Sequence, residues 1–187
     1  PRFFENTTLL DSLSYEEAIE LSYYGASVIH PKTLQPLQQK EIPLYVKCFL
    51  KPKNKGTKVG KSLDLSPNVP CYILRKDQIL ITVSSLDFSY IVEENISHIF
   101  KLLHLYKMKV RSIQNSAISF SVCIENSYNH LEPLILQLKA KYNVRLDKSV
   151  DLYTIRHYTT DAIEEIQKNK TVLMKQITPK TVQIITK

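Results

Sequence analysis

The sequence lacks the cysteine pairs and long apolar runs that mark several classes of protein. Its three cysteines are scattered, with no CxxC pair and an odd total, so neither a disulfide framework nor a zinc ribbon is expected. No apolar run approaches the roughly 18–20 residues needed to cross a bilayer, so we expect no membrane partner. The chain starts at Pro1 without a charged and apolar leader, and we expect a cytoplasmic fragment of a longer protein.

Motifs for catalysis and for metal binding are also missing. There is no P-loop, GxGxxG, HExxH or GxSxG string, and no histidine stands beside a plausible nucleophile. The adjacent pairs Glu16–Glu17 and Glu93–Glu94 are no acid/base dyads, because neighbouring residues of a helix point in different directions. We therefore expect neither catalytic residues nor metal ligands.

The composition is that of a globular protein with a surplus of positive charge. Hydrophobic residues make up 43% and charged residues 23% of the 187 residues, which suits one domain or two small ones. The net charge of +7 admits an anionic partner. However, the densest lysine block, 51–61, holds no aromatic residue on which a base could stack. A solvated, mobile loop is the favoured interpretation.

The first forty residues predict two short helices. Ser14 and Glu17 are spaced as a capping box, and Gly25 is placed to end the helix. Pro31 suits the first position of a second helix, which Pro36 should limit or kink.

A strand and a connection follow these helices. The partly β-branched segment 42–50 predicts a strand with Pro43 near its start, and 51–70 is rich in Lys, Gly and Pro.

The rest of the chain alternates between strand and helix periods. We predict elements in the order strand, helix, strand, strand, helix, strand, at 79–85, 92–106, 110–113, 118–124, 131–142 and 144 onward. This order is the split βαβ of ferredoxin-like folds, so one α+β module should span 71–150.

The same pattern then begins again and stops early. Segment 152–158 predicts a strand, 161–168 a helix capped by Thr160, and 171–186 a hairpin. This repeat lacks its last helix and strand. The strand at 42–50 could supply the missing strand, which would wrap the second module around the first.

One longer string carries a resemblance to a known family. It runs SYEEAIEL from Ser14, then GASVIHPKTL from Gly25, and continues through IPL at 42–44 to Gly56-Thr57. It resembles the end of the kinase domain of aspartate kinases, which reads "EA-EL--GA-V-HP-T" and is followed by an "IP" strand and "P---GT". Pro1-Arg2 looks like the end of that family's "DPR" motif.

The resemblance implies a domain organisation. In that family two ACT modules, ferredoxin-like units that bind amino acids, follow the kinase domain, with one module nested in the other. Accordingly 1–41 would end the kinase domain, 71–150 would be the inserted ACT domain, and 42–50 with 151–187 the second, split and shortened one.

The resemblance also implies a function. Aspartate kinases phosphorylate L-aspartate with ATP, the first step toward lysine, threonine and methionine. The chain would be their regulatory and dimerisation part, inactive alone, with no cofactor of its own. ATP and Mg would belong to the parent enzyme. The implied partners are an amino-acid effector (threonine or lysine), a second copy paired through ACT domains, and the kinase lobe of the same chain.

Individual site residues follow only from this resemblance. Arg2 and Val28 match positions that border the nucleotide, while Ser27 replaces a lysine there. The implied effector-binding residues are Phe88, Ser89, Val110, Arg111, Asn115 and Ser116. Arg111 stands where lysine-sensitive members carry an aspartate, so we expect it to repel lysine and to tolerate threonine. An ACT module kept for dimerisation alone is the other interpretation.

A basic ferredoxin-like module that binds nucleic acid is the alternative function. Such modules carry exposed aromatic residues on their central strands. Segment 118–124 offers only Phe120, on its apolar face, so the sequence favours no nucleic-acid partner.

Overall fold

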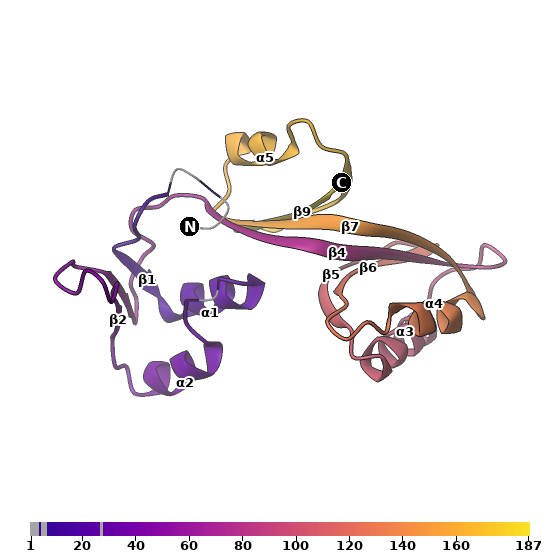
Figure 1. The fold of residues 1–187 in the computed structure, drawn as a ribbon, viewed down its shortest axis with the longest axis horizontal. Helices are drawn as coiled ribbons and strands as arrows, with labels where there is room; N and C mark the ends of the chain where they lie inside the picture. The colour runs from indigo at the N-terminus through magenta and orange to yellow at the C-terminus, as the bar shows by residue number, and fades with distance from the viewer. Residues whose placement is uncertain (1–3, 5–6, 27) are drawn as a thin grey trace. The chain divides into compact units, whose positions relative to one another are not determined.

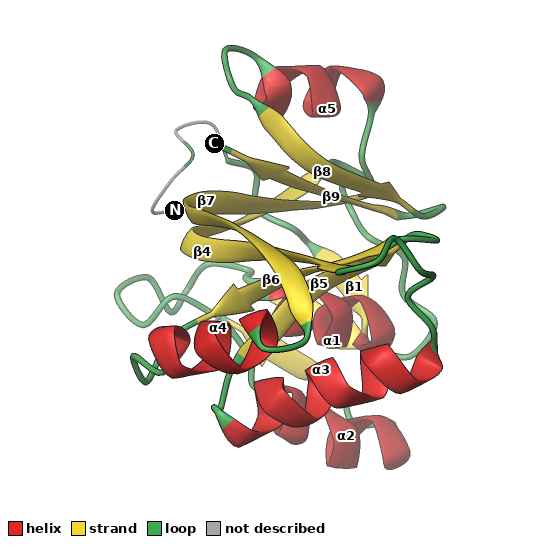
Figure 2. Cartoon of the chain, turned by 90° about the vertical axis from the view of Figure 1, so that its right-hand side faces the viewer, coloured by secondary structure: helices red, strands yellow, loops and turns green. Residues whose placement is uncertain are grey.

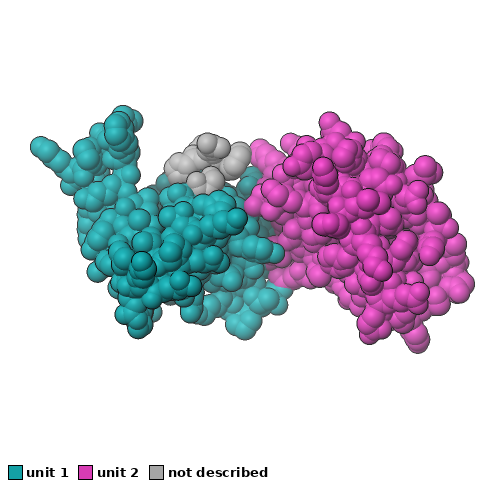
Figure 3. Space-filling model, turned by 90° about the horizontal axis from the view of Figure 1, so that it is seen from below, with its two compact units in different colours: residues 1–74, 153–168, 177–182 teal, residues 75–152, 169–176, 183–187 magenta. Residues whose placement is uncertain are grey.

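The structure is a computed structural model that describes residue 4 and residues 7–26 and 28–187. The chain forms two compact units (Figure 3). Unit 1 comprises residues 1–74, 153–168 and 177–182, and unit 2 comprises residues 75–152, 169–176 and 183–187. Among the described residues, no helix combines the length and apolar character needed to span a membrane.

The N-terminal part of unit 1 combines a small sheet with two helices (Figure 1). β1 and β3 are parallel and β2 and β3 antiparallel, in the order β1-β3-β2. Leu34 and Val59 are fully buried in its small core. The elements are β1 (Ser12–Ser14), α1 (Tyr15–Tyr24), α2 (Pro31–Gln39), β2 (Leu44–Val46) and β3 (Thr57–Gly60).

Both predicted helices form, with two corrections. Ser14 Oγ accepts a 3.0 Å hydrogen bond from Glu17 N, and Gly25 ends α1 with a φ of 127°. The Glu17 side chain, however, does not complete a capping box with Ser14, because it binds another partner described below. α2 begins at Pro31 and continues past Pro36, which removes one intrahelical donor without ending the helix.

The segment expected to complete the second module lies elsewhere. Within 42–50 only β2 is extended, and it pairs with β3 in the small sheet rather than with the strands of 151–187. Between β2 and β3 the chain passes through Gly56, whose φ is 70°. A Cβ at this position would lie 2.3 Å from Val46 O. The lysine-rich segment is therefore partly a strand, and it holds 42–50 in the small sheet.

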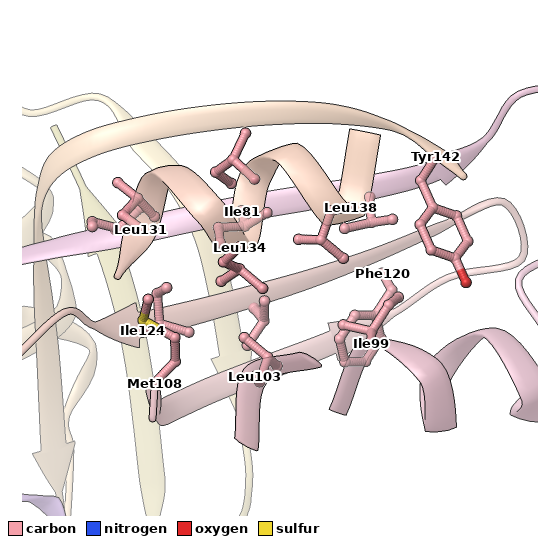
Figure 4. Close-up of a cluster of buried hydrophobic side chains, with 14 of the residues drawn as sticks. Ile81, Ile99, Leu103, Met108, Phe120, Ile124, Leu131, Leu134, Leu138 and Tyr142 are labelled. Atoms are coloured by element: carbon pink, nitrogen blue, oxygen red, sulfur yellow. The ribbon is translucent and has the colours of Figure 1, made fainter. Parts of the chain in front are cut away.

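Residues 71–156 form a βαββαβ unit, in the order of elements that was predicted for 71–150. Its elements are β4 (Cys71–Ser85), α3 (Glu93–Leu105), β5 (Lys109–Asn115), β6 (Ser119–Glu125), α4 (Leu131–Lys139) and β7 (Tyr142–Arg156). Figure 2 shows α3 and α4 on the same face of the β4–β6 strands. Their apolar faces meet the strands in one core that includes Ile99, Phe120 and Leu134 (Figure 4). The α+β fold class is confirmed.

Two strands are longer than the sequence indicated. β4 and β7 each have 15 residues, so the segments predicted as separate strands around 144 and 152 are one strand. Polar residues such as Lys148 interrupt the apolar pattern of β7, but the backbone pairing continues through them.

The second module uses these same long strands. α5 (Thr160–Gln167), β8 (Val172–Ile177) and β9 (Thr181–Thr186) follow β7, and Thr159 rather than Thr160 caps α5 by accepting a 3.2 Å bond from Ala162 N. The six-stranded sheet has the order β5-β6-β4-β7-β9-β8. Hence β7 lies between β4 and β9, and the segment 42–50 contributes no strand to this sheet.

Candidate functional site

The structure brings four of the six predicted effector residues to neighbouring segments. Ile91 N donates a 2.9 Å hydrogen bond to Ala117 O, which ties the loop before α3 to the turn between β5 and β6. Phe88 and Ser89 belong to that loop, and Asn115 and Ser116 to the end of β5 and the turn. All four side chains are exposed.

Asn115 and Ser116 nevertheless do not form one polar pair. Side chains alternate between the two faces of a strand. Asn115 is opposite Phe120, whose ring is buried in the core under the helices, whereas Ser116 and Gln114 line a groove on the sheet. A ligand in this groove would contact Ser116 without Asn115.

Val110 and Arg111 lie near the other end of β5. Ser116 follows Arg111 by five positions, which corresponds to about 16 Å of extended chain. Arg111 is the extra residue of a β-bulge, and its Nε donates a 3.1 Å hydrogen bond to Glu125 Oε2. This hydrogen bond is the main reason that the pKa of Glu125 lies below its usual value. The charge of Arg111 is thus compensated, and Arg111 is not among the residues that line the groove.

The loop before α3 holds a carboxylate that the sequence did not single out. Asp87 Oδ1 accepts a 2.9 Å hydrogen bond from Ser85 Oγ and a 3.1 Å bond from Ser89 N. Hydrogen bonds from Ser89 and Ser85 lower the pKa of Asp87 to about 2. The backbone amide of Ser89 is therefore hydrogen-bonded within the loop.

The groove lies in the part of unit 2 where β5 and β8 come into contact. Ser112 Oγ on β5 donates to Gln176 Oε1 on β8 at 3.0 Å, although β5 and β8 are the first and last strands of the sheet. Leu80, Leu173 and Met174 supply apolar walls next to a second buried cluster. The recess has a volume of about 310 Å³.

We call this recess the serine groove. Its polar lining comprises Thr82, Gln114, Ser116, Ser119, Ser121 and Arg145. Thr82 Oγ1 and Ser121 Oγ lie 3.1 Å apart, within hydrogen-bond distance. Among the described lining residues, Arg145 is the one that carries a charge, and its side chain is 69% exposed while its Nε lies 3.4 Å from Asp147 Oδ2. The groove thus offers one guanidinium and several hydroxyls.

Sequence reasoning found only Ser116 among these groove residues. The alternation of Ser119 and Ser121 with apolar residues predicted a polar face of β6, which was the available signal. Thr82 comes from β4, which pairs with β6, and Arg145 comes from β7, which follows β4 in the sheet order. Only the tertiary fold brings these strands together.

The residues assigned to a nucleotide form no site within the described part of the chain. Arg2 lies outside the described residues, and Val28 is 70% exposed at an apolar recess of about 190 Å³. No group of three or more His, Cys, Asp or Glu among the described residues is arranged to hold a metal ion.

A buried ion pair joins α1 to the C-terminal strands of unit 1. Arg156 donates from Nε to Glu17 Oε1 at 3.0 Å and from Nη2 to Glu17 Oε2 at 2.6 Å. Arg156 Nη1 also reaches Thr181 Oγ1 at 2.8 Å and Glu20 Oε2 at 3.3 Å. Both Arg156 and Glu17 are 8% exposed, so the bidentate pair is almost dry.

The ion pair keeps Glu17 ionised. Burial raises the pKa of Glu17, but hydrogen bonds and positive charge from Arg156 and His157 outweigh burial and leave its pKa below the usual value. The hydrogen bond to Glu17 likewise raises the pKa of Arg156.

The paired ferredoxin-like modules with their long shared strands are a known arrangement. The aspartate kinase of Clostridium acetobutylicum, described as an allosteric enzyme, superposes with a TM-score of 0.84 at 20% identity, covering 100% of this chain and 47% of that one. A C-terminal regulatory domain of aspartate kinase from Porphyromonas gingivalis superposes with a TM-score of 0.53 at 20% identity, covering 64% of this chain and 86% of that one. The fold is that of aspartate kinase regulatory regions.

Sequence comparison finds similarity to the same proteins. The model of the amino acid kinase family matches residues 1–48. The lysine-sensitive aspartokinase 3 of Escherichia coli is 25% identical over 83% of this chain and 36% of its own length, and the chloroplastic aspartokinase 1 of Arabidopsis thaliana is 27% identical over 73% and 24%. The chain matches the C-terminal regulatory region of the aspartokinases, and it spans about a third or less of these relatives.

The ion pair should control acid stability. Because the pKa of Glu17 is lower in the folded than in the unfolded chain, its stabilisation is present above about pH 4.5 and is lost as the pH falls through the folded pKa. Glu17→Gln leaves Arg156 buried without its partner and should lower the free energy of unfolding at pH 7 by about 3–5 kcal/mol. It should also flatten the pH dependence below pH 4.5.

Chemical denaturation at pH 7 and across pH 3–5 measures both effects. The neighbouring exposed Glu16 provides the control, since Glu16→Gln should change the free energy of unfolding by less than about 0.5 kcal/mol. Equal effects of the two substitutions would show that the pair contributes nothing specific.

Proposed function

We propose that the chain is the regulatory and dimerisation part of an aspartokinase that converts ATP and L-aspartate to 4-phospho-L-aspartate. The match of residues 1–48 to the amino acid kinase family, joined to a sheet like that of aspartate kinase regulatory regions, carries this proposal. The kinase lobe of the parent would supply the ATP and Mg sites, and the parent would be cytoplasmic. The buried ring of Phe120, 1% exposed, gives no support to a nucleic-acid module.

The apolar recess of unit 1 suits contact with that lobe. Leu9 and Val28 are 61% and 70% exposed at its edge, and Leu13 and Val59 form its buried side. An apolar recess of this kind is expected to be covered by the rest of an amino acid kinase domain.

The chain alone should not catalyse the reaction. Phosphoryl transfer depends on groups that position the phosphates and neutralise their charge, usually with metal ions. The described residues assemble no such metal site. Release of ADP from ATP and aspartate by the purified chain is therefore expected to stay at background. Aspartate-dependent release above background would contradict this.

We further propose that the serine groove holds the amino-acid effector. Arg145 would bind the α-carboxylate, and the hydroxyls of Ser116, Ser119 and Ser121 would accept hydrogen bonds from the α-ammonium group. The described lining offers no carboxylate to a lysine side chain, whereas a second hydroxyl group, as in threonine, finds polar partners. This preference for threonine does not depend on the charge of Arg111, which is paired with Glu125.

Calorimetric titration with threonine and lysine tests the groove. Threonine should bind more tightly than lysine, and Arg145→Met should weaken threonine binding about tenfold, because it removes a charged hydrogen-bond donor. Lys148→Met is the control, since Lys148 is on the same strand, loses the same charge and lies outside the groove. Tighter binding of lysine, or equal losses in the two variants, would refute the assignment.

The exposed apolar side chains of unit 2 support a homodimer. Leu86, Phe88 and Tyr90 in the loop before α3 are 60%, 86% and 71% exposed. Ile113 and Ile118 at the adjoining end of β5 are also exposed. Exposed apolar side chains of this kind mark interfaces, and β5 is the first strand in the order of the six-stranded sheet. We propose that two copies of the chain pair across this surface.

Substitution at the centre of this surface tests the dimer. Light scattering should report a dimer for the unmodified chain and a monomer for Phe88→Glu, because a charge would be buried without a partner. Phe49→Glu is the control, since Phe49 is 94% exposed but belongs to the small sheet region of unit 1. A monomeric unmodified chain at tens of micromolar would contradict the proposal.

A further inference from the structure

A second recess in unit 2 carries a surplus of positive charge. It lies between α3 and the start of β7 and shares no lining residue with the serine groove. Its volume is about 430 Å³, within the range of about 300–1,000 Å³ that is usual for small-molecule sites. Its side chains include Glu94, Ser97, His98, Lys101, Lys141 and Tyr142.

The two lysines of this recess are uncompensated. Both are exposed, and in the part of the chain that the structure describes no carboxylate lies within 4.0 Å of either ammonium group. Glu94 lines the same recess but makes no ion pair with them. Two ammonium groups against one carboxylate leave the recess positive at neutral pH.

A fixed imidazole stands beside these charges. His98 Nδ1 lies 3.2 Å from the hydroxyl oxygen of Tyr142, and the two rings are 5.9 Å apart. Tyr142 is 5% exposed and anchored in the core, as Figure 4 shows. When Tyr142 donates to Nδ1, the neutral imidazole carries its proton on Nε2 and has a donor left for a ligand.

The imidazole also senses the lysine charges. Burial lowers the pKa of His98, and the charges of Lys141 and Lys101 lower it further. An anion held between the lysines would offset their effect and raise this pKa.

We propose that this recess binds a small phosphate-bearing molecule. Lys101 and Lys141 would neutralise the phosphate, and the Ser97 hydroxyl and His98 would donate hydrogen bonds to its oxygens. Ammonium groups bind phosphates as point charges, and two of them match a phosphate dianion better than a single carboxylate. The site is separate from the serine groove, so, if the groove holds the effector as proposed above, occupancy of this recess would add a second input to the same unit.

Nuclear magnetic resonance of the His98 ring tests the site, with inorganic pyrophosphate as the probe at constant ionic strength. Pyrophosphate should raise the pKa of His98 in a saturable way. Lys101→Ala and Lys141→Ala should each weaken binding about threefold to fivefold, as expected for exposed ion pairs. Glu94→Gln should strengthen it about twofold, since it removes the one carboxylate.

Lys139→Ala is the matched control. Lys139 is exposed at the end of α4, outside the recess, and its loss changes the net charge by the same amount. Unchanged binding by this variant, together with losses in the two recess variants, supports the site. A His98 pKa that does not respond, a response that does not saturate, or an equal loss in Lys139→Ala overturns it.

Discussion

The bidentate ion pair of Arg156 with Glu17 is the constraint on which the arrangement of unit 1 depends. It ties α1, within the segment matched by the amino acid kinase family, to β7 and β9 of the six-stranded sheet. Neither charge tolerates burial without the other, so α1 has one favourable position against these strands. Thr181 Oγ1 and Glu20 Oε2 accept hydrogen bonds from the remaining nitrogen of the guanidinium, Arg156 Nη1.

The sequence could predict the elements whose periodicity is local. α3 and α4 show a helical apolar face, and β6 alternates strictly, so all three form where expected. The lengths of β4 and β7 could not be predicted, because their polar residues are held in the sheet by backbone pairing with neighbours distant in sequence. The predicted pairing of the segment 42–50 was wrong for the same reason, because strand pairing depends on the tertiary fold.

The candidate site shows the same division between local and tertiary information. Family motifs led to Ser116, which lines the groove, and to Asn115 and Arg111, which do not. A one-residue step reverses the face of a strand, and the bulge at Arg111 directs its side chain toward Glu125. Arg145 could not be found from the sequence, because its place in the groove depends on how β7 follows β4 in the sheet.

One strand then connects the two functions that we assign to the chain. Arg145, the proposed anchor of the effector, and Arg156, which holds α1, both belong to β7. A ligand that orders β7 should therefore also order α1. Hydrogen exchange of the α1 amides, measured by mass spectrometry with and without saturating threonine, tests this most directly. We predict slower exchange in α1 when threonine binds, and loss of that effect in Arg156→Met. Threonine binding whose protection stops at the groove, or no amino-acid binding at all, would contradict the account.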